Sequence, residues 1–376
     1  MAGIYIHIPF CRQACHYCDF HFSVSLKGKA DFLHALKDEM RVQKEYFGKQ
    51  NVSTVYFGGG TPSVLSGEEI GEIFGELSEH FSIDKDAEVT LEANPDDLTT
   101  EKLKELSQTP VNRLSIGIQS FRDEDLKFLN RIHSAMEAVE SVKNAKQVGF
   151  ENITIDLIYG IQTLTNDQWR KNIEQAMSLG IPHISCYSLT IEPGTALQSF
   201  IKSGKIKNAD PEKSAEQFEM LMNEMEKNSF IHYEISNFCM EGAYSKHNSN
   251  YWRGEKYLGL GPSAHSFNGE SRQWNVKSNA GYIRSLAEGK VPFEIETLTE
   301  SQRYNEYILT SLRTKWGADT EFVRKSFGPD FFAHLHKEVG QFLKDGLVVQ
   351  QGDIMFLSRK GKLFADRIAS DLFRVS

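Results

Sequence analysis

The sequence lacks several features that mark common functional classes. No run of about 18 apolar residues, the length of a membrane-spanning helix, occurs in it. Its 42 Lys and Arg are outnumbered by 51 Asp and Glu, and the net charge of −9 argues against a broad nucleic-acid-binding surface. The opening MAGIYIHIPF has no basic segment of a signal peptide, and five cysteines, an odd number, do not suit a secreted disulfide framework. We therefore expect a cytoplasmic protein with no membrane span and no nucleic-acid partner.

What is present is a regular alternation of short β-rich segments and amphipathic helical segments. The order predicts parallel βα units. Six such units are two short of a full eight-stranded barrel, so we expect an α/β fold with a partial (β/α)6 barrel that is TIM-like; a flat doubly wound sheet is the alternative. The expected strands are 3–8, 52–57, 87–92, 112–118, 152–158 and 182–188, and the expected helices 29–47, 66–80, 99–107, 134–148, 165–179 and 212–228.

The pattern changes twice after this barrel, which we assign to residues 1–235. Residues 236–275 are rich in Asn, Ser, Gly and aromatics and show no clear period, so we expect a loop-rich extension over 236–297. Residues 298–376 predict a mainly helical, winged-helix-like domain, with helices at 299–313, 318–326, 330–345 and 359–373 and a hairpin in GLVVQQGDIMFLS. The acidic balance of the chain favours a packing role for this domain over DNA contact.

Three cysteines directly follow the first expected strand. Cys11, Cys15 and Cys18 have the spacing C-x3-C-x2-C, which lets one loop place three thiolates around one metal centre. Zinc sites usually bring ligand pairs from two places, although His16 and His21 could complete one here. An iron–sulfur cubane held by three thiolates leaves one iron free for a substrate or cofactor, and the spacing is highly specific for that arrangement.

The cysteine segment resembles the signature of the radical S-adenosylmethionine (SAM) superfamily. The resemblance implies a [4Fe-4S] cluster on the three cysteines, with SAM on the fourth iron and cleaved to an adenosyl radical by one electron. Within the superfamily, YIHIPFC and the sequence after it resemble the oxygen-independent coproporphyrinogen III oxidase group, over essentially the whole chain.

The stretch VYFGGGTPSVL places glycines at the end of the second strand. Glycines at the carboxyl end of a parallel strand let the backbone approach a ligand closely. The stretch is neither a P-loop nor a dinucleotide fingerprint, and a tight turn without a ligand is the alternative. By the resemblance, Gly58, Gly59, Gly60 and Thr61 form the motif that meets the amino group of SAM.

Polar residues stand at or near the ends of the other expected strands, where a barrel builds its site. A charge within an apolar strand, such as Asp156 in TIDLIYG, is costly unless it is paired or bound to a ligand, and an ion pair with Arg131 is the alternative to ligand binding. By the resemblance, the SAM-contacting positions are Tyr5, Glu92, Gln119, Arg131 and Asp156. Glu92 could instead face the substrate or a second SAM.

SKHNSNYWRG contains a further motif. His247, Asn248, Tyr251 and Trp252 reproduce an H-N-x-x-Y-W pattern associated with the haem-chaperone branch of the group. Histidine is a common axial ligand of haem and aromatic rings stack on porphyrins, so we expect haem contacts from His247, Tyr251 and Trp252. His265, in GLGPSAHSF, and Tyr251 are alternative haem contacts to His247. A structural role is the competing interpretation of such a loop histidine.

Two departures separate this chain from the dehydrogenases of the group. Phe20 stands where those enzymes typically carry a further cysteine, and the chain starts two residues before the first strand, without their N-terminal extension. We therefore expect a chaperone that binds haem, a [4Fe-4S] cluster and SAM and passes haem to an acceptor protein, which could be a membrane cytochrome; an electron donor is a further partner. SAM could be cleaved or regulatory. The alternatives are a coproporphyrinogen III dehydrogenase and a zinc-stabilised binding module.

Overall fold

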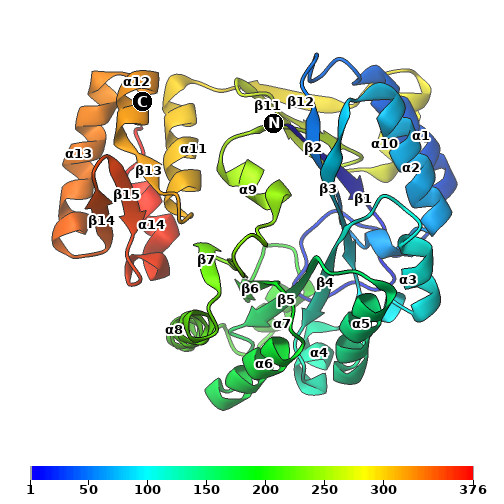
Figure 1. The fold of residues 1–376 in the computed structure, drawn as a ribbon, viewed down its shortest axis with the longest axis horizontal. Coiled ribbons are helices and arrows are strands. Elements are labelled where there is room, and N and C mark those ends of the chain that lie inside the picture. Colours follow the sequence, from blue (N-terminus) through cyan, green and yellow to red (C-terminus); the bar gives the residue numbers. More distant parts are fainter. Residues whose placement is uncertain (1, 376) are drawn as a thin grey trace.

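Twelve strands form one large sheet, and helices cover its outer face (Figure 1). The computed structural model describes residues 2–375. Six parallel strands follow one another in chain order within the sheet, which curls into the partial barrel that the sequence predicts, so the flat sheet is excluded. They are β1 (Ala2–Ile8), β2 (Val52–Gly59), β3 (Ile83–Ala93), β4 (Arg113–Gln119), β5 (Ile153–Tyr159) and β6 (His183–Ser188).

Helices connect these strands as the sequence predicts. Several begin at a capping box, in which Ser66, Ser134 or Thr165 accepts a hydrogen bond from the backbone three residues on and the third residue bonds back. No helix within residues 2–375 is both long enough and apolar enough to span a membrane. The crossing helices are α1 (Lys29–Val42), α2 (Gly67–His80), α3 (Thr100–Leu106), α5 (Ala135–Val148), α6 (Asn166–Ser178) and α8 (Pro211–Lys227).

Two helices that the sequence did not predict hold the cysteine segment in place. They are α4 (Asp123–Leu129) and α7 (Ala196–Lys202), each only seven residues long. The backbone N–H of His16 donates to the Leu129 carbonyl at 3.1 Å, and the Leu197 N–H donates to the His16 carbonyl at 2.8 Å. Helices this short show little periodicity, and their stability comes from such tertiary contacts.

The barrel strands alternate between an apolar outer face and a polar inner face. Ile4, Ile6 and Ile8 of β1 are fully buried under the helices, as are the equivalent positions of the other strands. The inward positions instead carry polar groups, several of which hydrogen-bond between neighbouring strands. They include Tyr5, His7, Thr54, Tyr56, Glu88, Thr90, Glu92, Arg113, Ser115, Thr154, Asp156, His183 and Ser185. This polar lining is what the site is built from.

Residues 236–275 are not the loop region that the sequence predicts. Strand β9 (Lys256–Leu260) adds to the sheet parallel to β1, with Gly3 opposite Tyr257. The prediction was wrong because these strands are only three to five residues long, and β8 and β9 pair with β6 and β1, which are distant in sequence. The other elements between the barrel and the last domain are β7 (Ile231–Glu234), β8 (Asn237–Cys239), α9 (Lys246–Trp252), β10 (His265–Phe267), β11 (Ser271–Asn275), α10 (Asn279–Ala287) and β12 (Phe293–Thr297).

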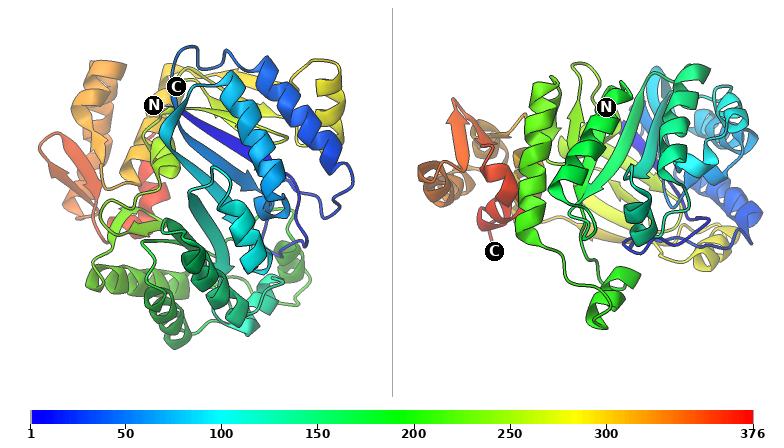
Figure 2. Two further views of the ribbon diagram at one scale, coloured as in Figure 1. Left: turned by 45° about the vertical axis from the view of Figure 1, so that its right-hand side comes forward. Right: turned by 90° about the horizontal axis from the view of Figure 1, so that it is seen from below.

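The C-terminal part packs around its own core beside α8 (Figure 2). Its helices and its hairpin agree with the sequence prediction, and Arg359 Nη1 contacts Glu226 Oε2 of α8 at 3.0 Å. The domain boundaries at 235 and 297 stay predictions. The elements are α11 (Glu300–Leu312), β13 (Ala318–Asp319), α12 (Thr320–Phe327), α13 (Pro329–Lys344), β14 (Val348–Gln351), β15 (Ile354–Leu357), the short 3-10 helix η3 (Gly361–Phe364) and α14 (Ala365–Asp371).

Candidate cofactor site

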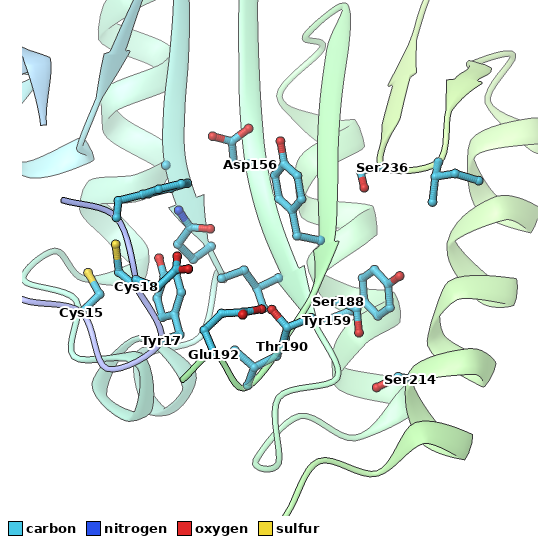
Figure 3. Close-up of a pocket in the computed structure, with 18 of the residues that line it drawn as sticks. Cys15, Tyr17, Cys18, Asp156, Tyr159, Ser188, Thr190, Glu192, Ser214 and Ser236 are labelled. Atoms are coloured by element: carbon cyan, nitrogen blue, oxygen red, sulfur yellow. The ribbon is translucent and has the colours of Figure 1, made fainter. Parts of the chain in front are cut away.

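The carboxyl ends of the barrel strands border a cavity of about 1180 Å³. Figure 3 shows its two ends: Cys15, Tyr17 and Cys18 lie at one side, and Ser214 of α8 lies at the other. A pocket for one small molecule measures about 300–1,000 Å³, so this cavity has room for more than one. It brings together most of the residues that the sequence predicts: Cys11, Cys15, Cys18, Gly59, Gly60, Thr61, Glu92, Gln119, Arg131 and Asp156.

The cysteine loop is fixed at its base and along its length. The Cys11 N–H donates to the Ser23 carbonyl at 3.0 Å, and the Ser23 N–H donates to the Pro9 carbonyl at 2.9 Å, which closes the loop. Asn130 then donates from Nδ2 to the Ala14 carbonyl at 2.7 Å. The loop is therefore preorganised by backbone hydrogen bonds.

The three thiols suit a cluster better than a single ion. Burial raises the pKa of Cys11 to about 11 and that of Cys18 to about 12, so a metal centre must displace their protons on binding. Within residues 2–375, these sulfurs do not come within 4.8 Å of one another as a trio, a spacing wide for one tetrahedral ion. His16 Nδ1 lies 2.9 Å from the Phe128 carbonyl and His21 Nε2 lies 2.7 Å from Asn279 Oδ1. Within residues 2–375, neither histidine forms a group with the cysteines in which the ligand atoms lie within 4.8 Å of one another.

Glycine is required after β2 by the protein's own packing. Gly59 has a φ of 104°, and a Cβ there would lie 2.6 Å from the His7 ring. A Cβ on Gly60 would lie 2.6 Å from the Phe10 carbonyl oxygen. The Thr61 N–H donates to that same oxygen at 2.7 Å. These contacts press the end of β2 against the cysteine loop, so the glycines serve the loop as well as any ligand. Gly58 lies behind the cavity wall, where Tyr5 fills the space beside it.

Glu92 is held at the cavity by two donors. The Tyr56 hydroxyl donates to Oε1 at 2.8 Å, and the Gly59 N–H lies 3.2 Å from Oε2. Burial, reinforced by the charge of Asp156, raises the pKa of Glu92 to about 7. This carboxyl can therefore change its protonation state near neutral pH when a charged ligand enters.

Arg131 joins the polar wall directly to the cysteines. Nη1 lies 3.5 Å from Cys15 Sγ, and Nη2 donates to Asn94 Oδ1 at 2.7 Å and to the Gly117 carbonyl at 2.8 Å. Asp156 makes no salt bridge with Arg131 within residues 2–375, so the purely structural ion pair is not formed; instead the Ser115 hydroxyl lies 3.4 Å from Asp156 Oδ2. Burial raises the pKa of Asp156 to about 6.

Gln119 and Tyr5 differ in how they relate to the cavity. Gln119 lines it with a left-handed backbone, φ 67°, a conformation that costs a residue with a side chain about 1 kcal/mol or more. Tyr5 is set back from the cavity, with its ring stacked on Tyr56 at 6.1 Å and its hydroxyl 3.3 Å from His7 Nδ1. Tyr5 therefore supports the cavity wall from behind and does not line the cavity itself.

The H-N-x-x-Y-W residues lie on α9, outside the cavity. His247 is buried at the opposite end of the barrel interior, where Nδ1 lies 2.8 Å from Thr54 Oγ1 and the backbone N–H donates to Glu88 Oε1 at 2.9 Å. Tyr251 packs edge-on to the His247 ring at 5.1 Å. Trp252 lies under the guanidinium of Arg313 at 5.2 Å. His265 is exposed on β10 and stacks on Trp274 at 6.2 Å.

Many cavity residues escaped the sequence analysis, and four of them show why. Asn94 could have been found, because it follows Glu92 by two residues and so shares its side of the strand end. Tyr17 could also have been found, because it lies between Cys15 and Cys18 in the sequence. Arg313 and Lys362 reach the cavity from the C-terminal domain, which no local pattern could indicate.

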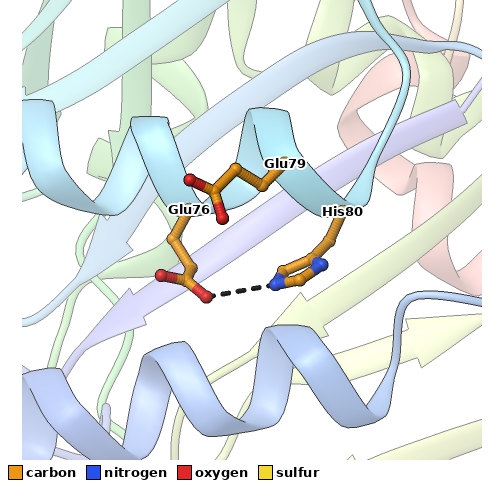
Figure 4. A group of neighbouring side chains, drawn as sticks. All are labelled: Glu76, Glu79 and His80. Carbon is orange, nitrogen blue, oxygen red and sulfur yellow. Dashed lines mark hydrogen bonds and ion pairs between the residues drawn. The ribbon is translucent and has the colours of Figure 1, made fainter.

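A separate acidic group lies on the outside of the barrel. Figure 4 shows Glu76, Glu79 and His80 together on α2. Glu76 accepts from Arg41 Nε at 2.9 Å and lies 3.1 Å from His80 Nε2. Arg41 thereby compensates the charge of Glu76, and this ion pair links α2 to α1.

An open parallel barrel with a three-cysteine loop after its first strand, facing a deep cavity, is the architecture of a radical SAM protein. Residues 5–198 match the radical SAM superfamily and residues 298–364 match the HemN C-terminal domain. The chain belongs to the radical SAM superfamily and, within it, to the HemN-like group, on the branch of the heme chaperones HemW. Membership implies SAM and a [4Fe-4S] cluster as cofactors.

Relatives match along the whole chain. The heme chaperone HemW of Bacillus subtilis (strain 168) is 34% identical over 371 residues, 98% of each chain. The heme chaperone HemW of Mycobacterium tuberculosis (strain ATCC 25618 / H37Rv) is 32% identical over 98% of this chain and 94% of its own. Among solved structures, coproporphyrinogen III oxidase (HemN) from Escherichia coli matches with a TM-score of 0.86 at 24% identity, covering 99% of this chain and 90% of that one. The latter likeness shows a shared fold.

Proposed function

We propose that this protein binds haem beside a [4Fe-4S] cluster and SAM and transfers the haem to an acceptor protein. The observation that carries the proposal is the cavity itself, which has the cysteine loop at one end and extends well beyond it to the C-terminal domain. The similarity to heme chaperones over 98% of both chains supports haem as the second occupant.

The end of the cavity that carries the cysteine loop fits the cluster and SAM. Cys11, Cys15 and Cys18 would hold the cluster, which supplies an open iron and one electron when bound. The protein's own groups do the rest: Arg131 donates to Cys15, and Glu92, whose carboxyl lines the cavity, would contact SAM. We assign the remaining SAM contacts to the wall residues Gly59, Gly60, Thr61, Gln119 and Asp156, supported by Tyr5 and Gly58.

The chaperone role is favoured over decarboxylation by Phe20. Its side chain is 66% exposed on the cysteine loop, where the dehydrogenases typically have a further thiol. The acceptor, the electron donor and a cytoplasmic location belong to the same proposal. Haem contacts of His247, Tyr251, Trp252 and His265 stay predictions, and the structure places the first three behind the cavity wall or beneath Arg313.

A paired anaerobic experiment on the reconstituted full chain tests the proposal. One sample receives SAM, reductant and coproporphyrinogen III and is analysed for decarboxylated product; the other is titrated with haem by absorption spectroscopy. We expect one haem per chain and no product. Product formed over multiple turnovers would restore the dehydrogenase, and the absence of stoichiometric haem binding would overturn the proposal. Zinc in place of iron would favour the binding module.

A further inference from the structure

The end of the cavity away from the cysteines is built jointly by the barrel and the C-terminal domain. Tyr159 of β5 and Phe218 of α8 line one side with parallel rings 6.0 Å apart, at an interplanar angle of 8°. Lys362, Phe364 and Arg367 line the same cavity from η3 and α14, and Lys362 contacts His232, whose ring packs edge-on to Phe218 at 5.9 Å. The lining thus combines aromatic rings with cations from the C-terminal domain.

Lys362 has donors to spare in this place. Its Nζ lies 2.9 Å from His232 Nδ1, and His232 Nε2 lies 3.0 Å from the Ile235 carbonyl. Because a carbonyl can only accept, Nε2 carries the proton and Nδ1 accepts from the ammonium, which fixes the tautomer. One N–H of Lys362 is used and two remain.

No carboxylate neutralises this ammonium directly. Within residues 2–375, Lys362 forms no salt bridge. Its burial, with the nearby charge of Arg359, lowers the pKa of Lys362 to about 8. A half-buried cation with free donors that faces a cavity is a site for an anionic group.

The neighbouring cations differ in how far carboxylates compensate their charge. Arg313 lies 3.1 Å from Glu234 Oε1 and also contacts Asp366, so it is already compensated. Arg367 is exposed at the cavity mouth, and its nearest carboxylate, Asp371, is 3.7 Å away. Lys362 and Arg367 are therefore the cations available to a ligand.

We propose that Lys362 and Arg367 bind the two carboxylate side chains of haem, whose macrocycle lies in this end of the cavity against Tyr159 and Phe218. The inference rests on the proposed function and adds where haem binds. It places haem in the cavity, in contact with the C-terminal domain, and leaves the His247 imidazole outside the contact surface.

Haem dimethyl ester tests the proposal, because it keeps the macrocycle and iron but lacks both carboxylates. The full-length reconstituted protein is titrated with haem and with the ester, as wild type and as Lys362→Gln, Arg367→Gln and the double variant. Gln at 362 can still donate to His232, so the local fold is kept. Lys362→Arg retains the charge, and Lys360→Gln removes a neighbouring exposed charge that does not line the cavity.

We expect the wild type to bind haem about tenfold more tightly than the ester for each charge-assisted bond that the ester loses. Lys362→Gln should weaken haem binding by about that factor and leave ester binding unchanged, so the preference shrinks; the double variant should lose it. Lys362→Arg and Lys360→Gln should keep it. Equal binding of haem and ester by the wild type, or full preference in the double variant, would overturn this site alone. No haem binding by the wild type would instead overturn the proposed function, and this site with it.

Discussion

The imidazole of His247 lies nearly parallel to the ring of Tyr56, 4.9 Å away at 27°. The Tyr56 hydroxyl donates to Glu92 at the cavity, so the motif residue is one side chain removed from the proposed SAM contact. Burial lowers the pKa of His247 to about 3, and the imidazole is neutral at physiological pH. Helix α9, which carries the H-N-x-x-Y-W motif, therefore supports from behind the side chains that line the proposed cofactor site.

Replacing His247 with Ala should weaken SAM binding more than haem binding. The substitution removes the support of Tyr56 and the bond to Thr54, so we expect about a fivefold loss of SAM affinity, corresponding to roughly 1 kcal/mol. Equilibrium binding of SAM to the reconstituted protein measures this. Tyr56→Phe, which keeps the ring and loses the hydroxyl, should reproduce the effect. A changed haem spectrum with intact SAM binding would show instead that His247 ligates haem, as the motif alone predicts.

Each cysteine of the loop should be indispensable for the cluster. Cys11→Ala, Cys15→Ala and Cys18→Ala remove one of three thiolates, and we expect each to lose most bound iron and sulfide after anaerobic reconstitution. Cys186→Ala and Cys239→Ala are matched controls, because both thiols are buried in strands and outside the cavity lining. A loop variant that retains full iron and sulfide would contradict the assignment.

Removing the Arg131 charge should lower the reduction potential of the cluster. A cation and a hydrogen bond at Cys15 stabilise the reduced, more negative state. Losing about 1.4 kcal/mol of that preference corresponds to about 60 mV for one electron. A redox titration followed by EPR compares Arg131→Gln with Lys127→Gln, an exposed charge on α4. An equal shift in both variants would contradict the specific role of Arg131.

Glu39 should make the apo protein less stable as pH rises. This buried carboxyl accepts from the Gly261 N–H at 2.7 Å, Asn275 Nδ2 at 2.6 Å and the Tyr282 hydroxyl at 2.6 Å, yet burial raises its pKa to about 7. Because the folded state holds its proton more tightly than the unfolded state, the stabilisation is complete below about pH 4.5. It is lost as pH rises through about 7, by at most about 3 kcal/mol.

Urea unfolding of the apo protein at pH 5.5 and 8 measures this effect as a difference between Glu39→Gln and the wild type. The comparison uses this difference because buried histidines, such as His7 with a pKa lowered to about 4, make the folded state more stable as pH rises. That contribution is the same in the variant and in the wild type, so it cancels. The stability of the variant relative to the wild type should rise with pH. Glu45→Gln, an exposed change after the same helix, should show no such trend. A pH-independent difference for Glu39→Gln would contradict the prediction.

The sequence alone predicted the parts of the fold that depend on local pattern. The sequence of strand β5, for example, is ITIDLIY, in which apolar residues alternate with Thr154 and Asp156. Strands of this kind alternate with helical segments, and this alternation predicts the repeated βα units. Strand β9 was missed because it has only five residues and pairs along its length with β1, and that pairing joins residues more than 250 positions apart. Non-local pairing leaves no local trace.

The candidate site divides in the same way. Cys11, Gly59 and Glu92 stand next to recognisable strand ends, so spacing and position indicated them. The positions of His247 and Lys362 depend on how α9 enters the barrel and how the last domain packs on α8, and their neighbours come from distant segments. The residue types can be read from the sequence. Their places, with His247 behind the cavity wall and Lys362 in the cavity lining, depend on the packing.

The parallel pairing of β1 with β9 bears on the order of events during synthesis. The strand that leads into the cysteine loop emerges from the ribosome well before its second neighbour, residues 256–260, which is made about 250 residues later. Until then one edge of β1 is open and available for wrong pairing. Strand β1, which leads into the cysteine loop, therefore gains its second neighbour only when residues 256–260 have been made, and truncated chains that end before β9 would expose that edge.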